Sequence, residues 1–235
     1  MIMWGVTMKN IAIIPARSGS KGVKDKNIKE IGGIPLMAYS INTARESKVF
    51  NTIMVSTDSK KYADIAEEYG AEVPFLRSEE NSGDNAGSWQ VVEEVLNYYY
   101  SKGIYFDTVC LLQPTSPLRT AEDITNGYEL LNNKKADAIT SVCQVEHSPL
   151  WTMRLPNNGS LAEFRRTIQD MPRQKLDQYY RLNGAIYIRK INYHEKNIEI
   201  MNKYEFAYVM EQQRSIDIDT NLDFILAELL MRKLQ

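Results

Sequence analysis

The chain has 235 residues, of which 43% are hydrophobic and 25% are charged, a composition typical of a soluble globular protein of one or two domains. Lys and Arg total 28 against 30 Asp and Glu, so the formal net charge is −2. This balance argues against a protein that binds nucleic acid or an anionic membrane, because both kinds of binding depend on an excess of positive charge.

The two cysteines and two histidines give no pattern of a disulfide framework or a zinc site. Cys110 and Cys143 each lie in an apolar run, and we expect them in the core as small hydrophobic residues. The longest apolar runs are far shorter than the ~20 residues that a membrane-spanning helix needs. The first seven residues, MIMWGVT, lack a signal-peptide cleavage site and are interpreted as an N-terminal extension. We therefore expect a cytoplasmic protein.

Strand and helix signals alternate over the first two-thirds of the chain. Continuous apolar runs predict strands buried on both faces, at residues 10–15, 52–57, 108–113 and 138–145. Apolar residues three and four positions apart predict helices after Pro35, after Asp58 as a cap, around 89–99 and from about Ala121. This alternation predicts an α/β fold of three layers, with helices on both faces of a mainly parallel sheet.

The pattern breaks down between about residues 146 and 178, where prolines and an Asn-Asn-Gly turn punctuate short segments of mixed polarity. We interpret 8–235 as a single domain with 146–178 as an inserted lobe. Strand patterns return at 184–188 and 206–210. The last helix is predicted to begin after a Thr220 cap, and its apolar stripe has amphipathic spacing: Leu222, Ile225, Leu226, Leu229 and Leu230.

The first segment that could carry chemistry is ARSGSKGVKDKN, residues 16–27. It follows a buried strand and therefore lies at the carboxyl edge of the sheet, where open α/β folds bind ligands. Four cations, two serines and two glycines in one short loop suit a polyphosphate, because guanidinium and ammonium groups bind phosphate oxygens. The loop lacks both the Walker and the dinucleotide fingerprints. A solvated basic surface loop is the alternative.

The second segment is SIDIDTNLD, residues 215–223. In an extended chain Asp217 and Asp219 point to one side, while Ile216 and Ile218 point into the core. Two such carboxylates can hold Mg²⁺, with water and substrate phosphates completing its coordination. In the alternative interpretation one acid caps the last helix and the other faces solvent.

The third signal consists of polar residues beside buried strands in two segments, LLQPTSPLR (111–119) and RLNGAIYI (181–188). An arginine and amides around an apolar floor would suit a hydroxylated carboxylic acid. Pro114 and Pro117 could equally form a rigid turn, with Tyr187 in the core.

Taken together and in this order, six segments resemble those of the acylneuraminate cytidylyltransferases, the CMP-sialic acid synthetases. They are IIPARSGSKGVKDKN, VSTD, LLQPTSPLRT, PRQ, NGAIYI and SIDIDT, and they extend over nearly the whole chain. The resemblance implies a nucleotide-binding, Rossmann-like fold and a homodimer built on the inserted lobe. It also implies a Mg²⁺-dependent (or Mn²⁺-dependent) reaction, in which CTP and a nine-carbon 2-keto sugar acid give the CMP-sugar and pyrophosphate.

The resemblance also implies residue roles. Nucleotide binding falls to the residues that match the family's triphosphate and cytidine positions, Arg17, Ser20, Lys21, Lys26, Asn27, Arg77 and Ser88. The sugar-acid side matches Gln113, Arg181 and Tyr187, and the metal pair matches Asp217 and Asp219. We expect Arg17, Lys21 and the two acids to be catalytic, because phosphoryl-type displacement needs alignment and charge neutralisation more than covalent help.

Two departures from the family bear on the sugar. Trp151 stands where some sialate-specific members carry a lysine, and an aromatic pair is replaced in the region of Ile198–Ile200. N-acetylneuraminate or a close relative is the first expectation for the substrate. Legionaminate is the next alternative, followed by 3-deoxy-manno-octulosonate. A catalytically dead nucleotide-binding regulator is the alternative outside enzymes, although intact Arg17, Lys21 and the acid pair argue against it.

Overall fold

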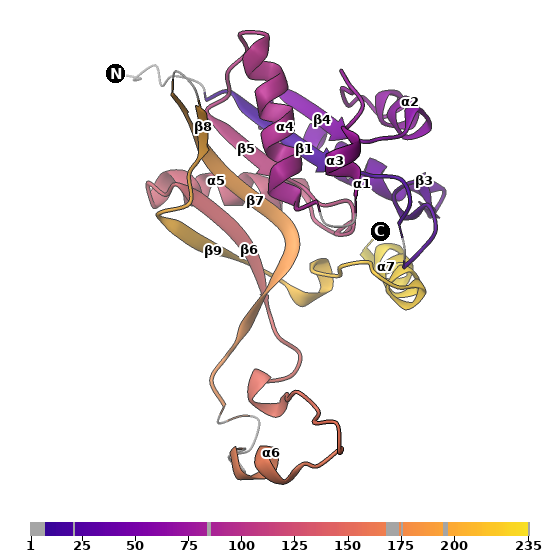
Figure 1. Cartoon of the computed structure of the whole chain (residues 1–235), viewed down its shortest axis with the longest axis vertical. Helices are drawn as coiled ribbons and strands as arrows, with labels where there is room; N and C mark the ends of the chain where they lie inside the picture. The colour runs from indigo at the N-terminus through magenta and orange to yellow at the C-terminus, as the bar shows by residue number, and fades with distance from the viewer. Residues whose placement is uncertain are drawn as a thin grey trace.

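The structure is a computed structural model that describes residues 8–234 except 21, 84–85, 168–173, 175 and 195–196. Its centre is a seven-stranded sheet in the order β4-β1-β5-β7-β6-β9, with β8 paired to β7 (Figure 1). The strands are β1 (Asn10–Pro15), β4 (Thr52–Ser56), β5 (Thr108–Leu111), β6 (Ala138–Gln144), β7 (Tyr180–His194), β8 (Asn197–Ile200) and β9 (Glu205–Met210).

The predicted α/β class with a mainly parallel sheet is confirmed, with one difference. β1 is parallel to β4 and β5, and β6 is parallel to β9. β7 runs antiparallel to both of its neighbours, β5 and β6, because the chain returns into the middle of the sheet after the inserted segment.

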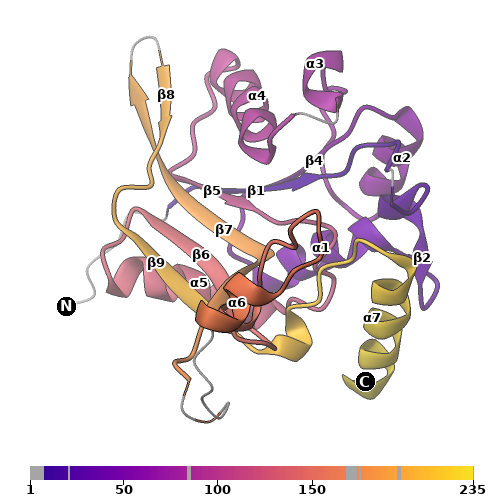
Figure 2. The same cartoon turned by 60° about the horizontal axis from the view of Figure 1, so that its bottom comes forward.

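Helices lie on both faces of the sheet, with α4 on one side and α1 and α5 on the other (Figure 2). The longer helices are α1 (Leu36–Ser47), α2 (Lys60–Glu68), α4 (Ser88–Ser101), α5 (Ala121–Asn133) and α7 (Asn221–Leu234). Short elements are α3 (Glu79–Ser82), α6 (Ala162–Thr167), the hairpin of β2 (Glu30–Ile31) and β3 (Ile34–Pro35), and the 3-10 turns η1 (Lys26–Ile28), η2 (Pro149–Trp151) and η4 (Gln212–Arg214). Within the described part of the chain, no helix combines the length and apolar character needed to cross a membrane.

The core explains why β1 reads as an uninterrupted apolar run. Ile11 and Ile13 pack into one buried cluster with the α4 face. Ala12 and Ile14 point the other way, into the cluster formed with α1, α2 and α5. Because both faces are covered, alternation of polar and apolar residues is absent from this strand. Cys110 and Cys143 are buried free thiols, as predicted.

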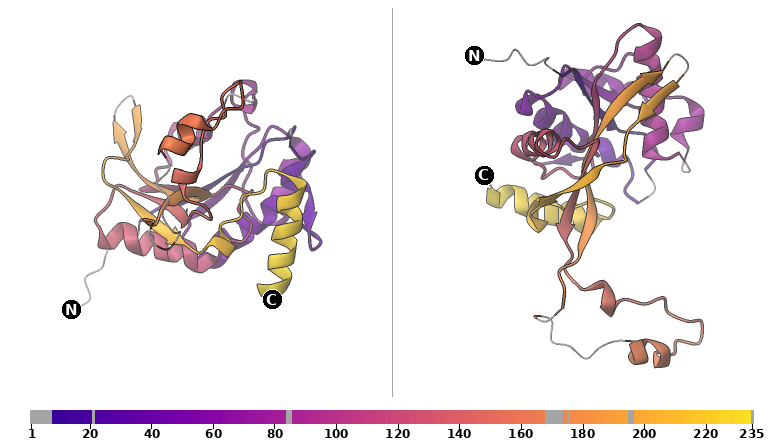
Figure 3. Two further views of the ribbon diagram at one scale, coloured as in Figure 1. Left: turned by 90° about the horizontal axis from the view of Figure 1, so that it is seen from below. Right: turned by 90° about the vertical axis from the view of Figure 1, so that its left-hand side faces the viewer.

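The segment predicted as an inserted lobe lies between the end of β6 and the start of β7. It projects from the body of the molecule and carries η2 and α6 (Figures 1 and 3). Residues 168–173 and 175 of this segment, and the N-terminal residues 1–7, lie outside the described residues.

One local prediction is wrong, and the last helix, which is confirmed as α7, packs with an unexpected face. Asp58 does not cap α2, whose N-cap is Ser59; the Asp58 carboxylate instead accepts hydrogen bonds from Ser18. The apolar stripe of α7 is mostly exposed, with the side chains at Leu222, Ile225, Leu226 and Leu229 facing outward. The helix buries Phe224 and Ala227 instead, in a small cluster with Val23, Ile31, Leu36 and Ile218. The Thr220 cap is confirmed, because Thr220 and Asp223 exchange hydrogen bonds.

Candidate active site

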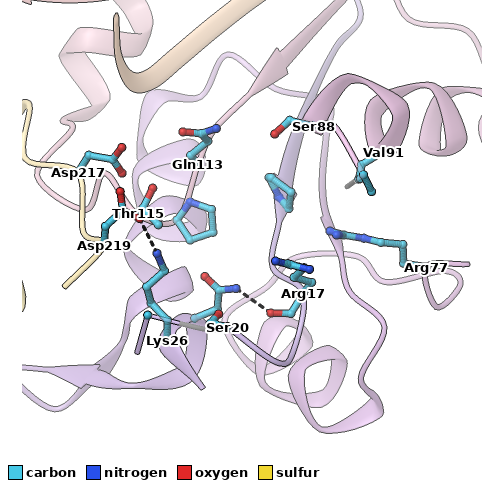
Figure 4. A pocket seen from close by; sticks show the side chains of 15 residues that line it. Arg17, Ser20, Lys26, Arg77, Ser88, Val91, Gln113, Thr115, Asp217 and Asp219 are labelled. Atoms are coloured by element: carbon cyan, nitrogen blue, oxygen red, sulfur yellow. Dashed lines mark hydrogen bonds and ion pairs between the residues drawn. The ribbon is translucent and has the colours of Figure 1, made fainter. Parts of the chain in front are cut away.

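Segments far apart in the sequence line one cavity, of about 580 Å³, at the carboxyl ends of β1 and β5. The loop after β1, the turn after β5 and the segment before α7 all reach it, and Arg77 and the start of α4 complete its wall. In Figure 4 Asp217 and Asp219 lie on one side of this cavity, and Arg17 and Arg77 lie on the opposite side. A space flanked by carboxylates and guanidinium groups suits a ligand that carries several phosphates and a metal ion.

The basic loop after β1 is held in shape by Asp58 and Tyr62, which follow β4 in the chain. The Ser18 N–H and the Ser18 hydroxyl both donate to the Asp58 carboxylate, at 2.7 Å each. Burial alone would raise the pKa of Asp58, but the Ser18 hydrogen bonds and the Arg77 charge bring it below its ordinary value. At the other end of the loop, the Tyr62 hydroxyl donates to Asp25 at 3.1 Å. The segment after β4 therefore fixes the loop against the sheet.

Lys26 joins the basic loop to the acidic segment. Its Nζ donates to the Ile218 carbonyl at 2.7 Å and to Asp219 Oδ1 at 3.1 Å. Gly22 lies against the same segment, and a Cβ atom there would come within 2.6 Å of the Asp219 carbonyl oxygen. The glycine is needed for this close approach, which brings the cations of one segment to the carboxylates of the other.

The acid pair shows the alternation predicted for an extended segment. Ile218 is fully buried between the two acids, and both Asp217 and Asp219 line the cavity. Burial raises the pKa of Asp217; the nearby Asp219 charge adds to this effect, while a Thr115 hydrogen bond and the Lys26 and Arg181 charges oppose it.

The donor set fits a hard divalent cation. The buried Oδ1 of Asp217 has no hydrogen-bond partner among the described residues, whereas Asp219 is largely exposed. No cluster of three or more metal-ligating side chains occurs in the described part of the chain. Mg²⁺ is typically held by one or two carboxylates, with water and substrate phosphates as its other ligands. These two oxygen donors fit that pattern.

Two guanidinium groups line the opposite wall. Arg17 donates to the Ser82 carbonyl at 3.2 Å. Arg77 is buried and donates to the Ser56 hydroxyl at 2.9 Å; burial lowers its pKa to about 10, so the group remains a cation at neutral pH. Asn27 is also buried and donates its amide N–H to the Arg17 carbonyl at 2.9 Å. Ser88, the first residue of α4, faces the same space (Figure 4).

The three residues predicted for the sugar acid lie in three different places. Gln113 lines the main cavity. Its side chain lies so close to Gly184 that a Cβ atom added there would come within 2.6 Å of Gln113 Oε1. Gly184 also has a φ of +75°, a region that favours glycine. Arg181 is exposed on β7 and donates to the Ser215 carbonyl at 3.2 Å. Tyr187 lines a neighbouring cavity instead.

The structure thus brings most of the predicted site residues together in the main cavity: Arg17, Ser20, Lys26, Asn27, Arg77, Ser88, Gln113, Asp217 and Asp219. Lys21 lies outside the described residues. Thr115, a member of the predicted polar segment 111–119, also lines the main cavity. Sequence reasoning did not assign Asp58 to the site, although it shapes the basic loop. Asp58 stands before a helix and looked like a cap, so its distant partner Ser18 left no signal in the local pattern.

Comparison with known proteins gives one family. The model of a family described as cytidylyltransferase matches residues 11–232. The chain is 36% identical over 226 residues to the CMP-N,N'-diacetyllegionaminic acid synthase of Legionella pneumophila, covering 95% of this chain and 97% of that protein. It is 35% identical over 226 residues to the N-acylneuraminate cytidylyltransferase of Escherichia coli O18:K1:H7, covering 96% of this chain and 52% of that longer protein.

A third relative acts on a different sugar acid, and a solved structure shares the fold. The pseudaminic acid cytidylyltransferase of Campylobacter jejuni is 30% identical over 225 residues, with 96% of this chain and 97% of that protein covered. The solved structure of CMP:2-keto-3-deoxy-manno-octonic acid synthetase in complex with CTP superposes with a TM-score of 0.68 at 14% identity. It covers 97% of this chain and 100% of that one, which shows a shared fold.

Proposed function

The chain belongs to the cytidylyltransferase family, and we propose that it uses CTP to activate a nine-carbon 2-keto sugar acid. The curated relatives are named for three such acids, the diacetyllegionaminic, acylneuraminic and pseudaminic acids. The observation that carries the proposal is the single cavity in which Arg17 and Lys26 of the basic loop face Asp217 and Asp219.

In the proposed reaction the anomeric hydroxyl oxygen of the sugar acid attacks the α-phosphorus of CTP. The new bond joins that oxygen to phosphorus, the bond to the bridging oxygen of the β-phosphate breaks, and pyrophosphate leaves. The hydroxyl proton passes to solvent. Reactions of this type depend mainly on alignment and on neutralisation of the charge that develops on the leaving group.

The side chains supply both effects. Arg17 and Lys26 would neutralise the phosphates of CTP, and the buried Arg77 would fix the nucleotide end from the far wall. Gln113 would hold the sugar acid beside Asp217. Asp217 and Asp219 would bind Mg²⁺, or Mn²⁺ in its place. When bound, such an ion lowers the pKa of a coordinated hydroxyl and polarises phosphate oxygens.

Among the nine-carbon (nonulosonic) acids, N-acetylneuraminate and the legionaminates are the candidates. The eight-carbon 3-deoxy-manno-octulosonate is the next alternative. The relatives of similar identity include enzymes named for the first two classes. At Trp151 and in the Ile198–Ile200 region this chain differs from the sialate-specific members, and legionaminate is therefore an alternative substrate.

The proposal is tested by incubating the purified chain with CTP, Mg²⁺ and each acid in turn. Pyrophosphate release and the mass of a CMP-sugar are then measured. We expect turnover with at least one nonulosonic acid, and none when the acid is omitted. Tight CTP binding without turnover on any acid would instead support a nucleotide-binding regulator.

A further inference from the structure

Asn183 of β7 is the centre of a buried hydrogen-bond network that lies behind the acidic wall of the main cavity. It is 1% exposed. Its side-chain nitrogen donates to the Ser215 hydroxyl at 2.9 Å and to Met210 Sδ at 3.3 Å. Its side-chain oxygen accepts from the Ser141 hydroxyl at 2.6 Å and from the Ala185 N–H at 3.2 Å. Both amide hydrogens and both lone pairs of the amide oxygen are therefore used.

These hydrogen bonds fix the orientation of the Asn183 amide. The Ala185 N–H can only donate, so the side-chain atom that faces it must be the oxygen, and the nitrogen then faces Ser215. The Ser215 hydroxyl donates its own hydrogen to the Glu211 carbonyl at 2.8 Å, which leaves its oxygen to accept from Asn183. Since these groups are buried, loss of the amide would leave them without hydrogen-bond partners.

Ser215 links the network to the acid pair. It is fully buried and precedes Asp217 by two residues. On the other side of Asp217, the Ile218 N–H donates to the Thr115 carbonyl at 2.8 Å, which ties the segment to the turn after β5. The Asp217 backbone is therefore held between two anchor points, and Asn183 contributes to the first of them through Ser215.

The residue that follows Asn183 brings the backbone of β7 against the cavity wall. Gly184 has a φ of +75°, and the register between β6 and β7 shifts at this point, as in a β-bulge. A Cβ atom added to Gly184 would come within 2.6 Å of Gln113 Oε1 and 3.6 Å of Asp217 Oδ2. In Figure 4 these two side chains lie on the same side of the cavity. One irregular stretch of β7 thus supports both of them.

We propose that Asn183 is a positioning residue, which orients Asp217 through Ser215 for binding of the divalent ion; this inference rests on the proposed function. Residues that hold metal ligands in place matter nearly as much as the ligands, and their loss typically weakens metal binding or activity by about 10–100-fold. Arg17 and Arg77 of the opposite wall are held by hydrogen bonds to other segments, so binding of CTP itself should depend little on this network.

The variants Asn183→Ala and Ser215→Ala remove the two ends of one hydrogen bond. Binding of Mn²⁺ is measured by electron paramagnetic resonance, with CTP present and the sugar acid omitted. We expect each variant to weaken Mn²⁺ binding by about 10-fold. The double variant should bind Mn²⁺ no more weakly than the weaker single variant, because both changes break the same link. The affinity for CTP without metal, measured by calorimetry, should change less than about threefold, because the opposite wall shares no partner with this link.

Asn10→Ala is the matched control, because Asn10 is also a buried asparagine with both ends of its amide in use. Its nitrogen donates to the Val49 carbonyl at 3.0 Å, and its oxygen accepts from the Thr108 hydroxyl at 2.7 Å. It lies at the start of β1, whereas the cavity lies at the end of that strand. Asn10→Ala should lower the melting temperature and leave Mn²⁺ binding unchanged.

Unchanged Mn²⁺ binding in Asn183→Ala and Ser215→Ala would overturn the inference, and so would an equal loss in Asn10→Ala. If Asn183→Ala failed to fold, Ser215→Ala would decide the question by itself, since it deletes a single oxygen atom. Normal Mn²⁺ binding in a folded Ser215→Ala would then contradict the proposed link.

Because Mn²⁺ binding is measured without a sugar acid, it separates this inference from the proposed function. If no acid were turned over but the two variants weakened Mn²⁺ binding as expected, the proposed function would fail and the role of Asn183 would be supported. If the unmodified protein turned over an acid and the variants bound Mn²⁺ normally, the proposed function would stand and the role of Asn183 would be contradicted. An unmodified protein that bound no Mn²⁺ would also contradict it.

Discussion

Arg17 is the residue at which nucleotide binding and catalysis can be told apart. It lines the wall opposite the acid pair, in the loop that Asp58 holds through Ser18. An interaction that is stronger in the transition state than in the ground state raises turnover rather than affinity alone. Because negative charge grows on the departing pyrophosphate, a preorganised cation in this position should contribute mainly to turnover.

We expect Arg17→Ala to lower kcat at saturating CTP by about 10²–10³-fold, the typical cost of losing one preorganised charge-stabilising group. The KM for CTP should change less. Arg17→Lys should restore only part of the rate, since the charge returns without the two-pronged guanidinium geometry. Steady-state kinetics of both variants provide the measurement. If Arg17→Ala raised KM and left kcat intact, Arg17 would be a binding group and Lys26 would take the leaving-group role.

Asp219 offers a second test at the scale of one residue. Its side chain is 77% exposed and lies 3.1 Å from Lys26 Nζ, so this ion pair should contribute less than about 1 kcal/mol to stability. As half of the proposed metal site it should matter much more for turnover. We expect Asp219→Asn to lower kcat by at least about 10²-fold and to weaken Mg²⁺ activation, with little change in melting temperature.

Asp64→Asn is the matched control, because Asp64 is an exposed carboxylate paired with Lys60 at 2.6 Å on α2. Its activity should equal that of the unmodified protein. Near-normal turnover of Asp219→Asn at every Mg²⁺ concentration would remove the metal assignment.

At the scale of single residues, the sequence predicts a site residue when its neighbours along the chain determine where its side chain points. The two-residue spacing of Asp217 and Asp219 in an extended segment is enough to put both on one cavity. The partners of Asp58 and Arg181 are 40 and 34 positions away, and local patterns carry no information about them. Such contacts depend on which strands become neighbours.

At the scale of elements, a buried ion pair ties the start of α5 to the turn that precedes the acidic segment. Arg214 donates to Asp123 from Nε and from Nη2, at 3.1 Å in each case, and the Asp123 side chain is 2% exposed. Burial would raise the pKa of Asp123, but the Arg214 and Thr120 hydrogen bonds hold it below its ordinary value. The pair therefore stabilises the folded state when Asp123 is ionised.

We expect Arg214→Met to lower the free energy of unfolding at pH 7 by about 3 kcal/mol, because it leaves a buried carboxylate without its counter-ion. A carboxyl group whose pKa is lower in the folded than in the unfolded state stabilises the fold fully at pH values above its unfolded pKa of about 3.9. This contribution is lost as the pH falls toward the folded-state pKa. The difference in free energy of unfolding between the unmodified protein and Arg214→Met should therefore narrow below about pH 4. Urea unfolding at several pH values measures it, and a difference independent of pH would contradict the account.

The helices also show where periodicity misleads. The spacing of Leu222, Ile225, Leu226 and Leu229 is amphipathic, yet α7 buries the face that carries Phe224 and Ala227. Periodicity identifies a helix with an apolar side, but which side meets the core depends on where the preceding segment enters. Here Ile218 is already fixed in that small cluster, and it sets the orientation of the helix that follows.

At the scale of the whole molecule, the class of fold is predictable because buried parallel strands have a recognisable composition. The apolar runs predicted for β1, β4, β5 and β6 begin and end within two residues of the observed strands. The antiparallel course of β7 is not predictable from its own residues, since GAIYI is apolar in either direction. The direction is decided by the inserted segment, which returns the chain from the far end of β6.

That inserted segment leads to a prediction about assembly. It projects from the body (Figure 3). Leu150, Leu155 and Leu161 of this segment are exposed, Leu155 at 65%. Apolar side chains on a projecting segment are stabilised by packing against another surface, and a second copy of the chain can offer one. We expect a homodimer by sedimentation at micromolar concentration, and dissociation in the variant Leu150→Asp with Leu155→Asp. A monomeric unmodified protein would contradict this prediction.

The central claim is that the cavity between the basic loop and the acid pair transfers CMP to a nonulosonic acid. Incubation with [α-³²P]CTP tests it most directly, with and without Mg²⁺ and with each acid of the panel. The account predicts that the label moves into a CMP-sugar in equal amount to the pyrophosphate released, with one or more acids and only when the divalent ion is present. Label that stayed in CTP with every acid, or that moved equally well after the metal was chelated, would contradict it.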